Sequence, residues 1–201
     1  MIEMLDLTEI YRRVVMLERD LSDPIPGVHA RIQVTIGLLK EDEANELAAF
    51  CARNYPTLRE GEIRRRLREG NLCIVARYKG KIVHASWEAF GVHRLEYLRL
   101  RVHLAPDEVY GYDMHTAAEF RKQGIGRARA AWSLRYLRNA GYKRLIIDVL
   151  PENVASERSI LPLGFRRTAT LARIIHGPLK ITLYRPIRKP SSLGKMENCQ
   201  V

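Results

Sequence analysis

The sequence predicts a mixed α/β fold, and three features carry that prediction. Two apolar segments, residues 71–78 and 81–90, flank the turn dipeptide Lys79-Gly80, which is typical of an antiparallel hairpin. Apolar residues recur at helical spacing over 124–140, and Gly141 marks the end of that helix. The run LIIDVL at 145–150 is almost continuously apolar, as expected of a buried central strand. A strand before residue 124 and this one after it predict a crossover between two parallel strands.

The other elements follow in chain order. Apolar side chains recur at roughly helical spacing between Leu5 and Leu21, so residues 1–28 are expected to form an appended helical extension. The remaining expected elements are a strand at 31–38, helices at 41–53 and 59–69, a strand at 108–116, a short helix at 153–161, and strands at about 165–175 and 179–185. We therefore expect the domain itself to span residues 29–186, followed by a flexible tail at 187–201.

Composition limits the class of protein. The chain has 201 residues, of which 46% are hydrophobic and 28% charged, which suits one globular domain and excludes wholesale disorder. No apolar run approaches the ~20 residues that span a bilayer, and the charged N-terminal segment lacks the apolar core of a secretion signal. Three dispersed cysteines without a CxxC pair predict neither a metal site nor a disulfide framework. We expect a cytoplasmic protein that does not associate with membranes.

The charge balance is strongly basic. There are 34 Lys and Arg against 23 Asp and Glu, a formal net charge of +11, and the sequence pI is about 9.9. Such a balance attracts anions, whether nucleic acid, an acidic membrane or a phosphorylated small molecule, without choosing among them. The densest run is three arginines at 64–66, which could bind an acidic or phosphorylated ligand, and a solvated helix face explains it at least as well.

The segment RKQGIGR at 121–127 lies where the strand at 108–116 gives way to the helix at 124–140. A helix N-terminus offers unpaired N–H groups and the positive end of the helix dipole, so anions bind there. Two glycines let a phosphate approach the backbone, and the flanking basic residues add charge. Neither a P-loop nor a Rossmann fingerprint is present. The segment therefore predicts a polyphosphate cradle, against the alternative of a glycine-containing turn.

The spacing R-x-x-G-x-G, just after a strand and opening a helix, resembles the acyl-CoA signature of the GNAT superfamily of N-acyltransferases. Residues 114–126, MHTAAEFRKQGIG, are similar to the family's apolar strand followed by E-Y/F-R-x-x-G-x-G. Residues 151–165, PENVASERSILPLGF, resemble its second motif, an Asn-x-x-Ser helix closed by Leu-Gly-Phe. The predicted element order also agrees from about residue 31 to 186. The resemblance implies a central mixed, mostly antiparallel sheet with splayed central strands and flanking helices.

The resemblance also implies how coenzyme A, supplied as acetyl-CoA, is held. Its pyrophosphate is expected on backbone amides of the 123–127 turn, and its pantetheine arm between the strands at 108–116 and 144–150. The amide of Met114 is expected to donate to the developing oxyanion. The implied residues are Tyr112 and Met114 for catalysis, and Thr116, Arg121, Lys122, Gln123, Gly124, Ile125, Gly126, Arg127, Asn153 and Ser156 for the cofactor.

An acceptor amine must lose a proton before it attacks a thioester. The positions where family members often place the base hold Tyr110 and Tyr112, which are weak bases at their ordinary pKa near 10. These tyrosines are expected to line the acceptor pocket or to order a water. Alternation places Asp113 and His115 on the face opposite Tyr112 unless a bulge intervenes. The further candidates for the base are Glu88, Glu108 and His84.

The general acid is not assigned by the pattern. Ile160 stands where many family members carry a Tyr that is proposed to protonate the leaving thiolate. This departure affects the mechanism rather than the family resemblance.

The resemblance implies an N-acetyltransferase that acts by direct transfer in a ternary complex, because no Ser-His-Asp or catalytic Cys arrangement suggests a covalent step. The acceptor is left open between an amino sugar, another small amine, an amino acid and a protein amine. Two alternatives remain: transfer of a longer acyl group from CoA or an acyl carrier protein, and a non-catalytic acyl-CoA-binding or nucleic-acid-binding protein on the same fold. A homodimer is also expected, because final strands like these often pair between subunits in the family.

Overall fold

The computed structural model describes residues 11–54, 58–176, 179–187 and 196–198. The strands are β1 (Tyr11–Asp20), β2 (Thr35–Leu38), β3 (Leu72–Tyr78), β4 (Lys81–Ala89), β5 (Val92–Leu95), β6 (Leu100–His103), β7 (Glu108–Thr116), β8 (Arg144–Val149), β9 (Arg166–His176), β10 (Leu179–Pro186) and β11 (Met196–Asn198). The helices are α2 (Ala44–Asn54), α3 (Glu60–Arg68), α4 (Ile125–Asn139) and α5 (Val154–Ile160), with short 3-10 turns at Glu41–Glu43, Ala118–Phe120 and Leu161–Leu163.

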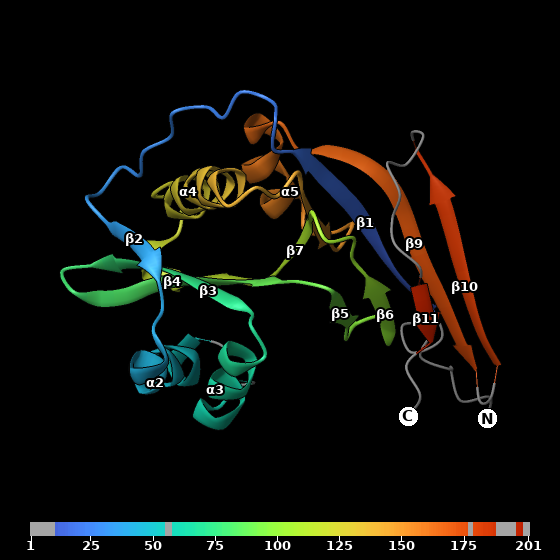
Figure 1. Ribbon diagram of the computed structural model, residues 1–201, viewed down its shortest axis with the longest axis horizontal. Helices are drawn as coiled ribbons and strands as arrows, with labels where there is room; N and C mark the ends of the chain where they lie inside the picture. Colours follow the sequence, from blue (N-terminus) through green and yellow to red (C-terminus); the bar gives the residue numbers. More distant parts are fainter. Residues whose placement is uncertain (1–10, 55–57, 177–178, 188–195, 199–201) are drawn as a thin grey trace, which may run out of the picture.

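An eight-stranded sheet in the order β10-β9-β1-β8-β7-β4-β3-β2 forms the centre of the molecule (Figure 1). Its strands pair antiparallel except β7 and β8, which are parallel and joined through α4. The hairpin of β3 and β4 turns at Lys79 and Gly80, which both have positive φ, the geometry of a two-residue type I′ turn. The predicted mixed α/β class, with a mostly antiparallel sheet and one parallel crossover, is therefore confirmed.

The expected helical extension at residues 1–28 is wrong wherever the structure describes it, because Tyr11–Asp20 form β1. This strand lies between β8 and β9 and pairs antiparallel with both. It is buried on its two faces: Val14 and Met16 pack into one hydrophobic cluster and Leu17 into another. A strand buried on both faces shows a continuous apolar run instead of alternation, and a helical spacing can be read into such a run. Residues 11–20 thus belong to the main sheet, whereas residues 1–10 lie outside the described part.

A second, three-stranded sheet in the order β11-β6-β5 was not predicted. β5 and β6 form a hairpin of two four-residue strands, and β11 pairs with β6. Met196–Asn198 therefore form a strand within the segment that was expected to be a flexible tail. Most of that segment, residues 188–195 and 199–201, lies outside the described residues.

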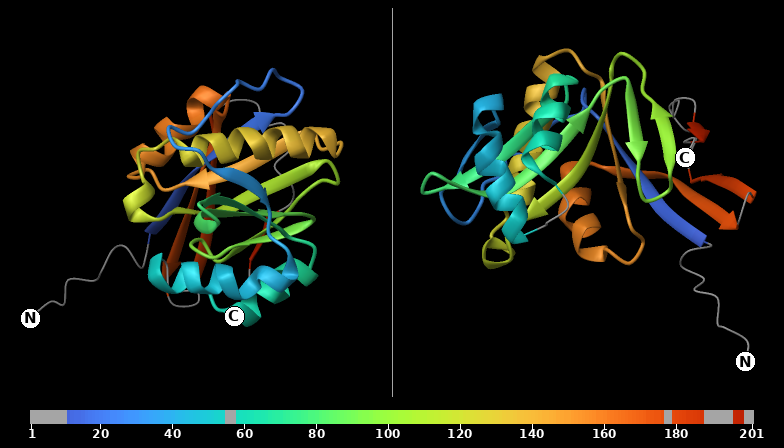
Figure 2. Two further views of the ribbon diagram at one scale, coloured as in Figure 1. Left: turned by 90° about the vertical axis from the view of Figure 1, so that its left-hand side faces the viewer. Right: turned by 90° about the horizontal axis from the view of Figure 1, so that it is seen from below.

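Helices and the hairpin cover both faces of the main sheet. Helices α4 and α5 lie on one face, where Leu134, Leu137 and Ile160 pack against Leu145 and Ile147. On the opposite face α2 and α3 cover β3 and β4, and Figure 2 shows the sheet between α4 and this helix pair. The β5–β6 hairpin covers the neighbouring part of that face, over β1, β7 and β8. Among the described residues, no helix is long and apolar enough to cross a membrane.

The two parallel strands separate halfway along their length. β7 and β8 pair only from Glu108 with Arg144 to Gly111 with Ile147. Beyond that point β7 stays with β4, and β8 stays with β1. The sheet is therefore splayed at its centre, as the family resemblance implied.

Candidate active site

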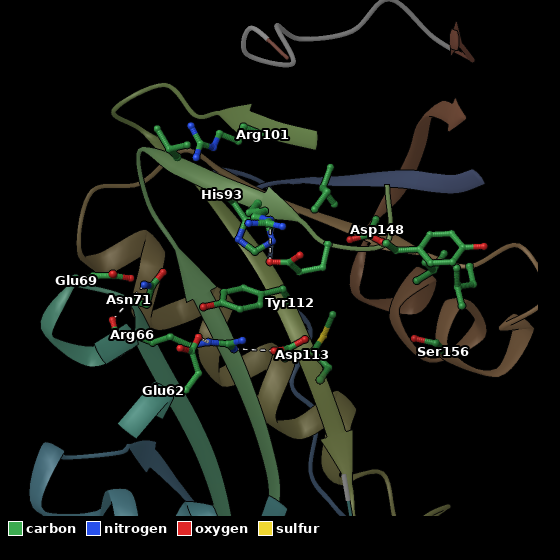
Figure 3. Close-up of a pocket in the computed structure, with 18 of the residues that line it drawn as sticks. Glu62, Arg66, Glu69, Asn71, His93, Arg101, Tyr112, Asp113, Asp148 and Ser156 are labelled. Carbon is green, nitrogen blue, oxygen red and sulfur yellow. Dashed lines mark hydrogen bonds and ion pairs between the residues drawn. The ribbon is translucent and has the colours of Figure 1, made fainter. Parts of the chain in front are cut away.

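A cavity of about 860 Å³ opens where β7 and β8 separate (Figure 3). Its walls come from the second half of β7, the end of β8 with the following connection, the start of α5, helix α3 and the β5–β6 hairpin. Polar residues of this lining are Glu62, Arg65, Arg66, Glu69, Asn71, His93, Arg94, Glu96, Tyr97, Arg101, Tyr112, Asp113, Asp148, Asn153 and Ser156.

A β-bulge in β7 shapes the floor of the cavity. Two residues of β7, Asp113 and Met114, face the single residue Ser86 of β4. Asp113 takes a positive φ of 48°, and a bulge of this kind changes which face the following side chains occupy. Tyr112, Asp113 and Met114 therefore all line the cavity, and the alternation that would have placed Asp113 on the other face does not hold.

Arg66 of α3 closes one side of this floor. Its guanidinium pairs with Asp113 at 2.6 Å and lies over the rings of Tyr112 and Trp87, 5.2 and 5.3 Å from their centroids. The paired charges and the stacked rings fix Tyr112 in a half-buried position. Burial raises the pKa of Tyr112, so its phenol stays protonated and is not a proton acceptor at neutral pH.

His93 enters the cavity from the hairpin. Its ring stacks on Tyr110 with centroids 4.5 Å apart and lies against Tyr112 at 4.4 Å. Burial, opposed by the charge of Asp113 and assisted by that of Arg66, lowers the pKa of His93 to about 4. His93 is therefore a neutral imidazole at physiological pH.

Asp148 lies on β8 beyond the last residue paired with β7. It accepts a 2.6 Å hydrogen bond from the hydroxyl of Tyr110. Burial raises the pKa of Asp148, and burial together with this carboxylate raises that of Tyr110. Tyr110 is fully buried, so its hydroxyl remains a permanent donor to the carboxylate.

The predicted cradle lies outside the cavity, on the connection from β7 to α4. Gly124 takes the left-handed conformation at φ 76° and precedes the first residue of α4. The amides of the first turn have no partner within the helix, and no acceptor for them occurs in the described part of the chain. The exposed side chains of Arg121, Lys122 and Arg127 surround this turn. Unpaired amides, two residues without side chains and three cations together fit a diphosphate.

A neighbouring segment holds the cradle in place. The amide of Arg31 donates to the carbonyl of Gln123 at 2.8 Å. A Cβ atom at Gly124 would lie 3.7 Å from the Cα of Ala30, which is ordinary contact, so the positive φ rather than lack of space calls for glycine here.

The other predicted site residues divide between the cavity and the cradle. Met114, Asn153 and Ser156 line the cavity together with Tyr112. Asn153 also caps α5, since its side-chain oxygen accepts from the amide of Ser156 at 3.1 Å. Thr116 lies toward the cradle: its carbonyl accepts from Arg121, and its hydroxyl contacts a ring nitrogen of His84 at 2.7 Å.

Three of the base candidates do not line the cavity. Glu88 is fully buried under α4, where it accepts from the hydroxyl of Ser133 at 2.7 Å. His84 belongs to the same buried network through Arg129. Glu108 pairs with Arg144 at the opposite end of β7. Ile160, at the position of the missing tyrosine, is a core residue.

Sequence reasoning missed Asp148 and His93. Asp148 had a signal: it is the single charged residue of the run LIIDVL, and a carboxylate inside a buried strand calls for a function or a partner. His93 had no signal, because the short strand VHRL carries no clear alternation of apolar residues. No cluster of three or more His, Cys, Asp or Glu suited to a metal occurs among the residues that the structure describes.

Solved structures share this fold. A GCN5-related glucosamine N-acetyltransferase region of a fungal multi-domain GH3 β-N-acetylglucosaminidase aligns with a TM-score of 0.59 and 21% identity, covering 79% of this chain and 20% of that one. A putative GNAT acetyltransferase from Novosphingobium aromaticivorans aligns with a TM-score of 0.57 and 18% identity, covering 80% of this chain and 63% of that one. A GNAT acetyltransferase from Colwellia psychrerythraea aligns with a TM-score of 0.59 and 14% identity, covering 89% of this chain and 57% of that one. The chain thus spans less than two thirds of the length of each of these proteins.

The sequence itself was also compared with known proteins. It matches none of the curated proteins. The model of the acetyltransferase (GNAT) family matches residues 39–165, from the end of β2 through the cradle and α4 to the close of the second motif. The chain therefore belongs to the GNAT acetyltransferase family.

Proposed function

We propose that the protein is an N-acetyltransferase that moves the acetyl group of acetyl-CoA to a primary amine. The observation that supports this most is the separation of β7 and β8 beside a cavity lined with polar groups. Separation leaves backbone donors and acceptors of both strands without a strand partner, and an extended amide-containing arm can take that place.

The cofactor is expected to extend from the cradle to the cavity. Its phosphates would accept from the first-turn amides of Ile125, Gly126 and Arg127, with Arg121 and Lys122 supplying charge. Its arm would follow β7 past Thr116 toward Met114, and Asn153 and Ser156 would contact it from the start of α5. Bound acetyl-CoA supplies an acyl thioester, whose carbonyl carbon is open to attack by a neutral amine.

The residues at the cavity then orient the reacting groups. The amide of Met114 is the proposed donor to the oxygen that gains charge, and Tyr112 is the proposed wall of the acceptor pocket. The phenol of Tyr112 can order the amine or a water by hydrogen bonding, because it keeps its proton.

Transfer is proposed to be direct. Cys51 of α2 and Cys73 of β3 are buried in the same hydrophobic cluster, and burial raises the pKa of Cys51 to about 11 and that of Cys73 further. A protonated and buried thiol is not a nucleophile, so neither residue can carry the acyl group.

Calorimetry with acetyl-CoA, followed by thiol release with glucosamine, putrescine, glycine and a lysine-containing peptide, tests the proposal. We expect binding of acetyl-CoA and amine-dependent release of thiol with at least one of these amines. Binding without turnover would instead indicate an acyl-CoA-binding protein. The absence of any heat of binding would reject both the cradle and the activity.

A further inference from the structure

We propose that Asp148 holds the ammonium group of the acceptor and takes its proton, and that Tyr110 positions the carboxylate for this step. The proposal rests on the acetyltransferase function proposed above. It assigns the proton acceptor to β8, whereas the pattern of the sequence directed attention to β7.

The position of Asp148 is the first argument. It follows Ile147, the last residue of β8 paired with β7, so it lies where the two strands begin to part. Ile146 pairs with Tyr110, and alternation places Asp148 on the same face as Ile146, toward the cavity. Figure 3 shows Asp148 across the cavity from Tyr112 and Asp113.

The hydrogen bonding of the carboxylate is the second argument. Tyr110 donates to Oδ1 at 2.6 Å, which fixes the orientation of the group. No other side chain in the described ranges donates to Asp148, and no lysine or arginine there forms an ion pair with it. The carboxylate also accepts from its own backbone amide, and no other side chain and no cation of the described residues competes with an acceptor that enters the cavity.

The charges of the cavity wall are the third argument. The four other carboxylates of the lining each pair with an arginine: Glu62 and Glu69 with Arg65, Asp113 with Arg66, and Glu96 with Arg94. Asp148 is the carboxylate of this lining without a cation, so the wall offers an uncompensated negative charge inside a basic protein. A cationic amine supplies the missing charge. Arg101, at the outer strand β6, lies opposite Glu197 of β11.

The proton balance is simple. One N–H proton of the ammonium group passes to Oδ2, which leaves a neutral amine and a carboxylic acid. The nitrogen forms its bond to the acyl carbon as the carbon–sulfur bond breaks, and the sulfur leaves with the electron pair. The proton held by Asp148 goes to that sulfur, and the second proton of the nitrogen goes to solvent.

The surroundings of Asp148 predict the pH dependence. Tyr110, Tyr112 and Asp113 face it from β7, neutral His93 lies over those tyrosines from β5, and Met16 is its partner on β1. Burial and the charge of Asp113 raise the pKa of Asp148, whereas the hydrogen bond from Tyr110 lowers it. Activity is therefore lost as pH falls through this raised pKa, and removal of the Tyr110 hydroxyl moves that loss to higher pH.

The main test is Asp148→Asn, with Glu152→Gln as the matched control. Glu152 is an exposed carboxylate in the same connection, outside the cavity lining. With the best amine of the panel above, we expect Asp148→Asn to lower kcat/KM about 100-fold or more at neutral pH, which is the usual worth of a positioned base. The loss should shrink above the pKa of the amine, where the amine is already neutral. Affinity for acetyl-CoA should stay within about twofold for both variants.

Tyr110→Phe provides the second readout, because it removes only the hydroxyl. We expect the acid limb of the pH–rate profile to move up by about one unit, since a hydrogen bond to a charged group is lost. An unchanged limb would reject the positioning role of Tyr110.

The outcomes separate the two proposals. If the wild type neither binds acetyl-CoA nor acylates an amine, the proposed function fails. If the wild type is active and Asp148→Asn matches it at neutral pH, or loses the same factor at every pH, only the assignment of Asp148 fails. Should Asp148→Asn not fold, the pH profile of Tyr110→Phe decides the question.

Discussion

Two segments of this molecule each carry three basic residues, and they differ in whether acidic side chains pair with those residues in the structure. In α3 each of the three consecutive arginines has an acidic partner: Arg64 pairs with Glu60, Arg65 with Glu62 and Glu69, and Arg66 with Glu62 and Asp113. At the start of α4, Arg121, Lys122 and Arg127 are exposed, and no ion pair involves them among the described residues. Charge that is already neutralised cannot attract a ligand, whereas charge beside unpaired amides can.

The spacing of acidic residues along a helix determines whether the arginines of a basic run form ion pairs. Acidic residues three or four positions from an arginine lie on the same helix face and pair with it, as Glu60, Glu62 and Glu69 do around the arginines of α3. The first turn of α4 has no acidic residue at all. This absence, together with the glycines, distinguishes the cradle from the longer arginine run in α3.

The largest expected effect comes from filling the cradle. Gly126 has an ordinary helical conformation, and a Cβ there would lie 3.8 Å from His84, so Gly126→Leu can fold. The new side chain would cover the first-turn amides, which removes two or three hydrogen bonds to charged oxygens worth ~1.5–3 kcal/mol each. We expect calorimetry to show a fall of at least about 100-fold in affinity for acetyl-CoA.

A matched glycine in α3 controls for this change. Gly61 is exposed with nothing near its missing side chain, so Gly61→Ala should leave acetyl-CoA affinity unchanged and slightly stabilise the helix. Unaltered affinity in Gly126→Leu would mean that the amides of α4 do not hold the cofactor.

A smaller effect is expected from removing the cradle's free cations. The triple change Arg121→Ala, Lys122→Ala and Arg127→Ala should weaken acetyl-CoA binding about 10- to 100-fold at low salt, and less at high salt, where exposed charges are screened. Titrations at two ionic strengths measure both effects. The double change Arg64→Ala and Arg68→Ala in α3 removes cations that are already paired, so it should alter neither the affinity nor its salt dependence.

Much of the fold could be predicted because most elements carry a periodic pattern with a clear start and stop. The hairpin at Lys79-Gly80, the helix of α4 and the parallel crossover follow from such patterns. The strand β1 could not be predicted in this way, because burial on both faces removes the alternation that identifies a strand. The β5–β6 hairpin could not be predicted either, since four-residue strands that contain arginines give too short a pattern.

The site was predictable in the same uneven way. The cradle is local in sequence, so its residues could be read together. The cavity is built from β7, β8, α3 and the hairpin, and only tertiary structure brings Asp148, His93 and Arg66 to one place. The bulge at Asp113 also depends on register with β4, which no local pattern fixes.

Low pH should weaken the ion pairs of α3 and leave the unpaired cations at the start of α4 unaffected. Hydrogen bonds from Arg65 lower the pKa of Glu62, so its ionised form stabilises the folded protein above the carboxyl's ordinary pKa. This stabilisation is lost as pH falls from about 4.5 through the lowered pKa. Urea denaturation of Glu62→Gln against wild type should show a difference of about 0.5–1 kcal/mol at pH 7 that vanishes at the acid end. A difference that persisted below the lowered pKa would rule out the ionised carboxylate as its source.

The smallest effect is expected for Arg68→Gln at the end of α3. Arg68 pairs with Glu41 at 2.7 Å, but its side chain is 67% exposed and its partner's 44% exposed. An exposed pair of this kind gains little over water and costs side-chain entropy, so the free energy of unfolding should change by less than about 0.5 kcal/mol. Lys122→Gln removes an exposed charge that has no ion pair among the described residues, and it should leave stability unchanged while lowering acetyl-CoA affinity several-fold in 20 mM salt. If the two variants instead changed acetyl-CoA affinity to the same degree, binding would follow total charge, and the distinction between paired and free cations would not explain it.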